Sequence, residues 1–231
     1  SQGAFTREAL KRYALLVGNN YGGRERVTLK YSLTDARAMG KVLQELGGVE
    51  KEDLYLLAEP SKKEIERVLA EMKERVAGAR EQYERIELLF YYSGHSDIQG
   101  LLIGQENLDY AFIRKAIKAI PADLKVAVLD SCASGAITRL KGGVKRPPFM
   151  VDSSMRMKGY AFITSSSHDE ASKESDRIKG SFFTYYFLSG LRGAADLSQD
   201  GRVTLNEVYQ YAFHETLSRT EKTVRDRKSV V

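Results

Sequence analysis

The sequence predicts an α/β protein whose central β-sheet is mostly parallel and is covered by helices on both faces. The first observation is a set of short apolar segments without polar alternation, a pattern typical of strands buried on both faces. These segments lie at residues 13–17, 54–57, 86–92, 126–129 and 160–164. The second observation is that segments with helical spacing separate most of these strands, and such alternation indicates a parallel sheet.

The predicted helices lie at residues 33–46, 61–83, 110–120, 181–191 and 205–217. Two glycines at 47–48 suit the end of the first helix. Ser61 followed by Glu64 is the pattern of a capping box, which predicts the start of the second helix. Pro121 ends the third helix, and residues 100–104 are expected to form a short strand or hairpin arm.

Length and composition indicate a single domain over residues 1–231, in which residues 1–3 resemble an expression scar. The net charge of +5 is spread along Glu-rich helices, so we expect no nucleic-acid binding. No apolar segment approaches the ~18 residues that a membrane span needs, so we expect no membrane association. The single cysteine excludes an internal disulfide and favours a reducing compartment, which we expect to be cytoplasmic. Residues 139–158, with glycine and proline pairs and many basic residues, predict a long basic loop.

Two of the predicted strands lead to residues that can form a nucleophile and its base. The segment 126–129 leads to Cys132, and the segment 86–92 leads to His95. Because open parallel sheets place their chemistry at the carboxyl ends of strands, both residues are candidate catalytic groups. A thiol attacks a carbonyl as its thiolate, and a histidine, whose ordinary pKa is near neutrality, is suited to take the proton.

Each of these residues also has an ordinary interpretation, as an inert buried thiol or as a loop histidine with a local hydrogen bond. His168 follows the last predicted strand and is a weaker candidate for the base, whereas His214 lies in the middle of a helix. A tyrosine-phosphatase loop needs an arginine after five intervening residues, but Arg139 follows Cys132 after six. A redox pair of cysteines is excluded because the chain has one.

Two blocks carry a family resemblance, Tyr91-Tyr92-Ser93-Gly94-His95 and Asp130-Ser131-Cys132-Ala133-Ser134-Gly135. They resemble the signature blocks of the caspase-like cysteine peptidases, and are most similar to those of the metacaspase and bacterial orthocaspase branch. The resemblance extends over most of the chain, through the blocks Leu33-Thr34-Asp35-Ala36, Asp169-Glu170-Ala171-Ser172, Gly180-Ser181-Phe182-Phe183-Thr184 and Gly193-Ala194-Ala195-Asp196. It implies a caspase-like fold and the activity of a cysteine endopeptidase.

By this resemblance, Cys132 is the nucleophile of a thioester acyl-enzyme, and His95 acts first as general base and then as general acid. The resemblance also implies an oxyanion hole formed by the N–H groups of Gly94 and Cys132. A glycine beside the histidine agrees with this, because it lets the main chain approach a developing oxyanion. Two departures, Ser96 for the usual glycine and Ala133 for the usual histidine, leave the dyad intact but bear on the substrate groove.

Resemblance to metacaspases places Asp35, Ser93 and Asp130 in the pocket for the residue before the cleaved bond. Carboxylates can hold a guanidinium through paired charge-assisted hydrogen bonds, and a buried acidic pair without a cation would repel. We therefore expect cleavage of protein or peptide substrates after Arg or Lys. The ordinary interpretations are a helix N-terminal acid for Asp35 and a turn-stabilising carboxylate for Asp130.

The segment from Asp196 to Glu207 fits the pattern of a twelve-residue calcium loop. Its candidate ligands are Asp196, Ser198, Asp200, Thr204 and Glu207. Thr204 and Glu207 also form a capping box, which explains both residues without a metal. The expected chemistry requires no cofactor, so calcium is a candidate ligand only.

Two further classes of protein remain as alternatives: a catalytically silent scaffold with a caspase fold, and another cysteine-dependent acyl hydrolase. The scaffold is less favoured because such proteins usually lack the nucleophile or the base, and this chain has both. For the peptidase we also expect self-cleavage in the basic loop 139–158, because an exposed flexible loop is a natural protease target. Its basic residues are Arg139, Lys141, Lys145, Arg146, Arg156 and Lys158.

Overall fold

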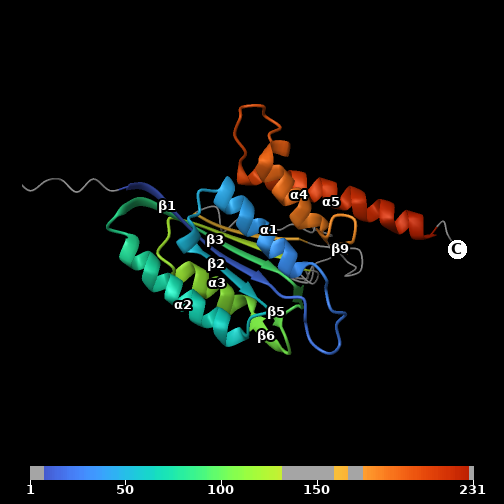
Figure 1. The fold of residues 1–231 in the computed structure, drawn as a ribbon, viewed down its shortest axis with the longest axis horizontal. Coiled ribbons are helices and arrows are strands. Elements are labelled where there is room, and N and C mark those ends of the chain that lie inside the picture. Colours follow the sequence, from blue (N-terminus) through green and yellow to red (C-terminus); the bar gives the residue numbers. More distant parts are fainter. Residues whose placement is uncertain (1–7, 132–158, 166–173, 229–231) are drawn as a thin grey trace, which may run out of the picture.

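The computed structural model describes residues 8–131, 159–165 and 174–228. Within these residues, five strands form one parallel sheet in the order β2-β1-β3-β7-β8 (Figure 1). The strands are β1 (Glu8–Gly18), β2 (Leu54–Ala58), β3 (Tyr83–Ser93), β7 (Leu124–Asp130) and β8 (Tyr160–Thr164). Each predicted strand is therefore present, and the expected parallel sheet is confirmed.

Helices cover both faces of this sheet (Figure 1). They are α1 (Ser32–Glu45), α2 (Lys62–Ala79), α3 (Tyr110–Ala119), α4 (Phe182–Ser189) and α5 (Leu205–Lys228). A 3₁₀ turn, Lys51–Asp53, precedes β2, and a π-helical turn, Gly190–Ala194, continues α4. The helices α2 and α3 lie on one face, and α1, α4 and α5 lie on the other.

The strand order explains this division of the helices. The chain moves from β1 outwards to β2 and then back past β1 to β3, so the two crossovers run in opposite directions. Because such crossovers are right-handed, their helices α1 and α2 are placed on opposite faces. The crossover from β3 to β7 continues in the second direction, which places α3 beside α2.

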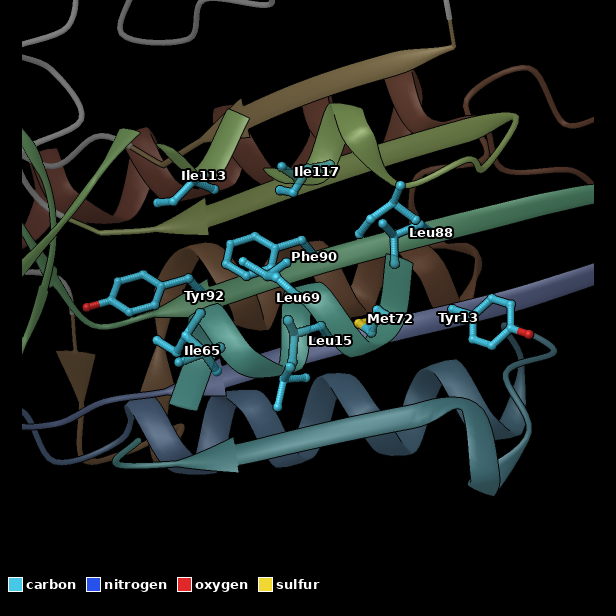
Figure 2. Packing of buried hydrophobic residues seen from close by; sticks show 14 of the residues in the cluster. Tyr13, Leu15, Ile65, Leu69, Met72, Leu88, Phe90, Tyr92, Ile113 and Ile117 are labelled. Atoms are coloured by element: carbon cyan, nitrogen blue, oxygen red, sulfur yellow. The ribbon is translucent and has the colours of Figure 1, made fainter. Parts of the chain in front are cut away.

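Alternate residues of the central strands supply the two halves of the core. On β3, Leu88, Phe90 and Tyr92 face α2 and α3, whereas Tyr91 faces the other layer. Figure 2 shows the first of these layers, to which Phe90 of β3 and Leu69 of α2 both contribute. Because successive side chains of a strand point to opposite faces, a strand covered on both sides needs apolar residues at every position.

Two small antiparallel elements lie outside the central sheet. One contains β4 (His95–Ser96), β5 (Gly100–Ile103) and β6 (Glu106–Asp109), and it confirms the short strand expected at 100–104. The other is a hairpin of β9 (Glu174–Ser175) and β10 (Gly180–Ser181), which the sequence did not predict. Both elements follow strands of the central sheet and lie near its carboxyl edge.

Several element boundaries differ from the sequence prediction, and helix α5 shows the largest difference, since it runs to Lys228 and not to the predicted position 217. The strand β1 begins at Glu8, five residues before the predicted apolar segment, because it pairs with β3 over this polar half. There Arg12 lies opposite Glu87, and their side chains form an ion pair at 2.8 Å. Helix α2 ends at Ala79, before the predicted position 83, because Tyr83 already pairs with Glu8 in the sheet. Among the described residues, every helix is too short or too polar to cross a bilayer.

Candidate active site

The carboxyl ends of three central strands meet at one edge of the sheet. In the register of the sheet, Gly18 of β1 pairs with Ser93 of β3, and Ser93 pairs with Asp130 of β7. The chain leaves β1 towards one side and β3 towards the other, so the strand order reverses between them. Ligands of open parallel sheets bind at such a reversal, and the loops after β1 and β3 therefore frame the candidate site.

The two predicted dyad residues follow neighbouring strand ends. His95 comes two residues after Ser93. Cys132 comes two residues after Asp130, which pairs with Ser93 in the sheet. Cys132 lies outside the described residues, which end here at Ser131, one residue after β7. His168 and the basic loop 139–158 also lie outside them.

The side chain of His95, in β4, is fully buried and lies against the loop between β1 and α1. Its Nε2 atom lies 2.8 Å from the carbonyl oxygen of Val27. Because a carbonyl oxygen only accepts, Nε2 must carry the proton, and the neutral ring then has its lone pair on Nδ1. Gly22 packs against the ring, so that a Cβ atom there would lie 2.6 Å from Cγ of His95.

The residues on either side of His95 are bound to the end of β7. The N–H of Gly94 donates to the carbonyl oxygen of Asp130 at 3.2 Å, and Ser96 Oγ donates to Ser131 Oγ at 2.8 Å. The hydroxyl of Tyr92 donates to the carbonyl oxygen of His95 at 2.7 Å. These bonds fix the histidine segment relative to the residues directly before Cys132. The predicted oxyanion donor Gly94 N–H is therefore engaged with a backbone carbonyl in this structure.

The structure brings together the predicted pocket residues Asp35, Ser93 and Asp130. Asp35 lies in the first turn of α1 and accepts the Ser93 hydroxyl at 3.5 Å. Its two carboxylate oxygens also accept the N–H of Ser181 at 3.2 and 3.1 Å. The hydroxyl of Ser181 in turn donates to Asp130. Both carboxylates are buried, with 4% of Asp35 and 0% of Asp130 exposed.

Hydroxyl groups surround the carboxylate of Asp130. Ser165 Oγ donates to its Oδ1 at 2.8 Å, and Thr184 Oγ1 donates to its Oδ2 at 2.6 Å, beside the bond from Ser181. Tyr91 lies next in this network, with its hydroxyl 2.6 Å from Thr184 Oγ1. Burial, followed by the negative charges of Asp35 and Asp130, raises the pKa of Tyr91 well above its usual value. These hydroxyls supply the donors that a buried carboxylate requires.

The β9–β10 hairpin, which carries Ser181, docks on the residues before α1. The carboxylate of Glu174 accepts the N–H groups of Lys30 at 2.9 Å and Tyr31 at 2.8 Å. Asp176 accepts the Tyr31 hydroxyl at 2.6 Å, and this bond, with nearby Lys30, lowers the pKa of the Asp176 carboxyl. The docked hairpin thus holds Ser181 against Asp35, which lies one helical turn after Tyr31.

The family to which this architecture belongs follows from sequence. A sequence model of the caspase domain matches residues 11–227. The chain belongs to the caspase-domain family. Its α/β fold, with a parallel central sheet and helices on both faces, is accordingly that of the caspase-family cysteine peptidases.

Solved structures agree with this assignment of the caspase fold. The chain is similar to caspase-1 from Spodoptera frugiperda, with a TM-score of 0.59 and 13% sequence identity, over 93% of this chain and 81% of that one. A structure described as pro-sf-caspase-1 gives a TM-score of 0.54 and 15% identity, over 89% of this chain and 76% of that one. At such identities the similarity shows the fold alone. No curated protein gives a significant match to the sequence.

The predicted calcium loop of this caspase domain forms a turn and a capping box. The carboxylate of Asp196 accepts the N–H groups of Asp200 at 3.2 Å and Gly201 at 3.0 Å, and Ser198 Oγ at 3.3 Å. Glu207 Oε2 accepts both the N–H of Thr204 at 2.9 Å and its hydroxyl at 2.8 Å. Among the described residues, His, Cys, Asp and Glu side chains form no group of three or more suited to a metal. The capping box therefore accounts for Thr204 and Glu207, and calcium binding stays a prediction.

Sequence reasoning on this caspase domain missed the hydroxyl residues around the acidic pair. Ser181 was predicted to lie at the start of a helix, and it caps α4 by accepting the N–H of Thr184 at 3.0 Å. Its contact with both carboxylates has no signal in the local sequence. Ser165 had a signal of its own, because it directly follows the end of β8, at the same edge of the sheet as Ser93 and Asp130.

Proposed function

We propose that this caspase domain is a cysteine endopeptidase of the metacaspase and orthocaspase type that cleaves proteins or peptides after Arg or Lys. The observation that carries the proposal is the buried acidic pair at the strand ends, where Asp35 and Asp130 share Ser181. Ser93, two residues before His95, donates to the first of these carboxylates. Two carboxylates at the strand ends that lead to the candidate base and nucleophile suit a guanidinium or an ammonium group. An acidic substrate side chain would instead meet like charges.

In the proposed mechanism, Cys132 is the nucleophile and His95 is the general base. The Nε2–H donated to Val27 leaves the lone pair on Nδ1, which takes the proton of the Cys132 thiol. The thiolate then attacks the scissile carbonyl carbon, and the electron pair of the C=O bond moves to the oxygen. The N–H groups of Gly94 and Cys132 are the proposed donors to this oxyanion. Gly94 must then exchange the Asp130 carbonyl, its partner in this structure, for the oxyanion.

The second half of the reaction releases both products. When the oxyanion collapses, the C–N bond breaks, and His95 gives its proton to the leaving amine. The acyl group remains on Cys132 as a thioester. A water molecule, deprotonated by His95, attacks this thioester and releases the carboxylic acid, and the thiol regains its proton. The chemistry requires no cofactor, and the proposed partners are cytoplasmic proteins or peptides with exposed basic residues.

Labelling with peptide-like probes tests this proposal directly. Two thiol-reactive peptide ketones, identical apart from Arg or Asp next to the reactive group, are compared on wild type and Cys132→Ala. We expect fast labelling of wild type by the Arg probe, slow labelling by the Asp probe, and none of the variant. Faster labelling by the Asp probe would overturn the assignment of the pocket while leaving the dyad intact.

The same probes, used together with a peptide library and small amides, separate the two alternative functions. A chain that folds but reacts with neither probe, and cleaves no member of a peptide library, would be a scaffold without catalysis. A chain whose Cys132 reacts with the probes, but which hydrolyses small amides and no peptide bond, would be another acyl hydrolase. Both outcomes contradict the proposed endopeptidase.

A further inference from the structure

A single residue of the β9–β10 hairpin contacts both carboxylates of the candidate pocket. The N–H of Ser181 donates to the two oxygens of Asp35 at 3.2 and 3.1 Å, and its hydroxyl donates to Asp130 Oδ2. The same hydroxyl oxygen accepts the N–H of Thr184 at 3.0 Å. Because Ser181 is fully buried, water does not replace any of these bonds.

Gly180, the residue before Ser181, leaves the space that the contact with Asp35 needs. A Cβ atom on Gly180 would lie 2.6 Å from Asp35 Oδ1, closer than real Cβ atoms approach an oxygen. The φ angle of Gly180 is not positive, so the lack of space, rather than the backbone conformation, requires glycine here. The hairpin therefore approaches the Asp35 carboxylate with its bare backbone, and this approach allows the N–H of Ser181 to reach it.

We propose that Ser181 is a positioning residue that fixes Asp35 and Asp130 relative to one another and thereby makes the pocket prefer Arg over Lys. Two neighbouring carboxylates repel each other, and each can rotate unless donors hold it. Serine offers an N–H for one carboxylate and a hydroxyl on a short side chain for the other, so one rigid residue restrains both. The inference rests on the proposed function and names the preferred substrate class of that site, arginine peptides.

The preference for arginine follows from the shape of the two cations. Guanidinium is planar and presents its N–H groups as a fork, which can bind carboxylates at two fixed positions. Ammonium is a compact charge on a flexible stem and gains little from a fixed pair. A pocket whose two carboxylates are held by Ser181 should therefore lose more affinity for Arg than for Lys when this restraint is removed.

The experiment compares peptides that differ only in Arg, Lys or citrulline before the cleaved bond. Ser181→Ala removes the hydroxyl bond to Asp130, Ser181→Thr restores it, and Gly180→Ala pushes on Asp35 without removing a polar group. Two matched controls make the same chemical changes away from the pocket. Ser61 caps α2 through the N–H of Glu64 at 3.2 Å, so Ser61→Ala removes an equivalent cap. Gly78→Ala, also in α2, adds a Cβ with nothing within 4 Å.

We expect Ser181→Ala to lower kcat/KM for the Arg peptide by about tenfold or more, mainly through KM, because a hydrogen bond to a charged group is lost. The Lys peptide should lose less, and the ratio of Arg to Lys cleavage should fall towards one. Ser181→Thr should restore the ratio, Gly180→Ala should lower it, and both controls should leave it unchanged. The rate at which iodoacetamide alkylates Cys132 should stay within about twofold of wild type, because the dyad is not touched.

Several results would overturn the inference, and they differ from those that would overturn the proposed function. A wild type that cleaves after Lys as fast as after Arg contradicts the role of Ser181 and leaves basic specificity standing. The same holds for a folded Ser181→Ala that keeps the wild-type ratio, or that loses all peptides and alkylation equally. If Ser181→Ala does not fold, an unchanged ratio in Gly180→Ala has the same meaning. A wild type with equal kcat/KM for the Arg, Lys and citrulline peptides contradicts the proposed pocket itself.

Discussion

Replacement of Asp35 by asparagine tests the charge of the pocket, because it removes one negative charge and keeps the shape of the side chain. Asp35 is 4% exposed and accepts the N–H of Ser181 at 3.1 and 3.2 Å. The amide oxygen of asparagine can keep one of these bonds, so the docked hairpin should stay in place. The change therefore acts on the substrate cation and much less on the fold.

The size of the effect follows from the burial of this carboxylate. At an effective dielectric constant of ~20, two unit charges about 4 Å apart attract by about 4 kcal/mol. Removal of one partner of a desolvated charge pair costs about 2–5 kcal/mol, of which much is the penalty of leaving the other charge unpaired. A loss of about 3 kcal/mol corresponds to a decrease in kcat/KM of about 100-fold or more.

The assay measures kcat/KM for matched Arg and citrulline peptides in wild type and Asp35→Asn. We expect the Arg peptide to lose about 100-fold and the neutral citrulline peptide to change little. The control is Glu45→Gln at the other end of the same helix, where the carboxylate is half exposed and pairs with Lys41 at 3.8 Å. A decrease of less than about threefold, or an equal loss for both peptides, would refute the reasoning.

Three further predictions concern the dyad, the basic loop and calcium. Cys132→Ala should abolish peptide turnover, and His95→Ala should lower it by several orders of magnitude, since it removes both base and acid; a variant that keeps a tenth of the activity contradicts the dyad. Active protein should cleave itself within 139–158, so mass spectrometry should detect fragments that the inactive cysteine variant lacks, and identical intact masses would exclude this. If calcium binds the loop after α4, millimolar calcium should raise Tm, and Asp200→Ala and Glu207→Gln should each abolish the rise, whereas an unchanged wild-type Tm favours the capping box alone.

The strands could be predicted from the sequence because their signals are local. The apolar run 126–129 is visible without knowledge of its neighbours, since burial on both faces needs an apolar residue at each position. The polar half of β1 gave no such signal, because its stability comes from pairing with β3, where Arg12 meets Glu87. Helix α2 was predicted too long for the same reason, since Tyr83, shortly after Ala79, already pairs with Glu8 of β1.

The part of the candidate site that lies at the strand ends could be predicted from the sequence. The residues Ser93, Asp130 and Ser165 all follow from the rule that parallel sheets gather their chemistry at one edge, although only the first two were named. The contacts of Ser181 with both carboxylates could not be predicted, because they depend on a hairpin that docks through Glu174 onto residues far earlier in the chain. Such contacts are set by tertiary structure and leave no pattern in the sequence around the serine.

The hydrogen bond from His95 to the carbonyl oxygen of Val27 has a consequence for genetics. Every amino acid carries this carbonyl, so no single substitution at position 27 deletes the partner of the histidine. The Val27 side chain is 80% exposed, and a mutational scan would therefore score the position as tolerant. Insertions and deletions in the loop between β1 and α1 would displace the carbonyl and should thereby abolish the proposed peptidase activity. The length of this loop and the glycine at position 22, rather than the side chain at position 27, therefore hold His95 in place.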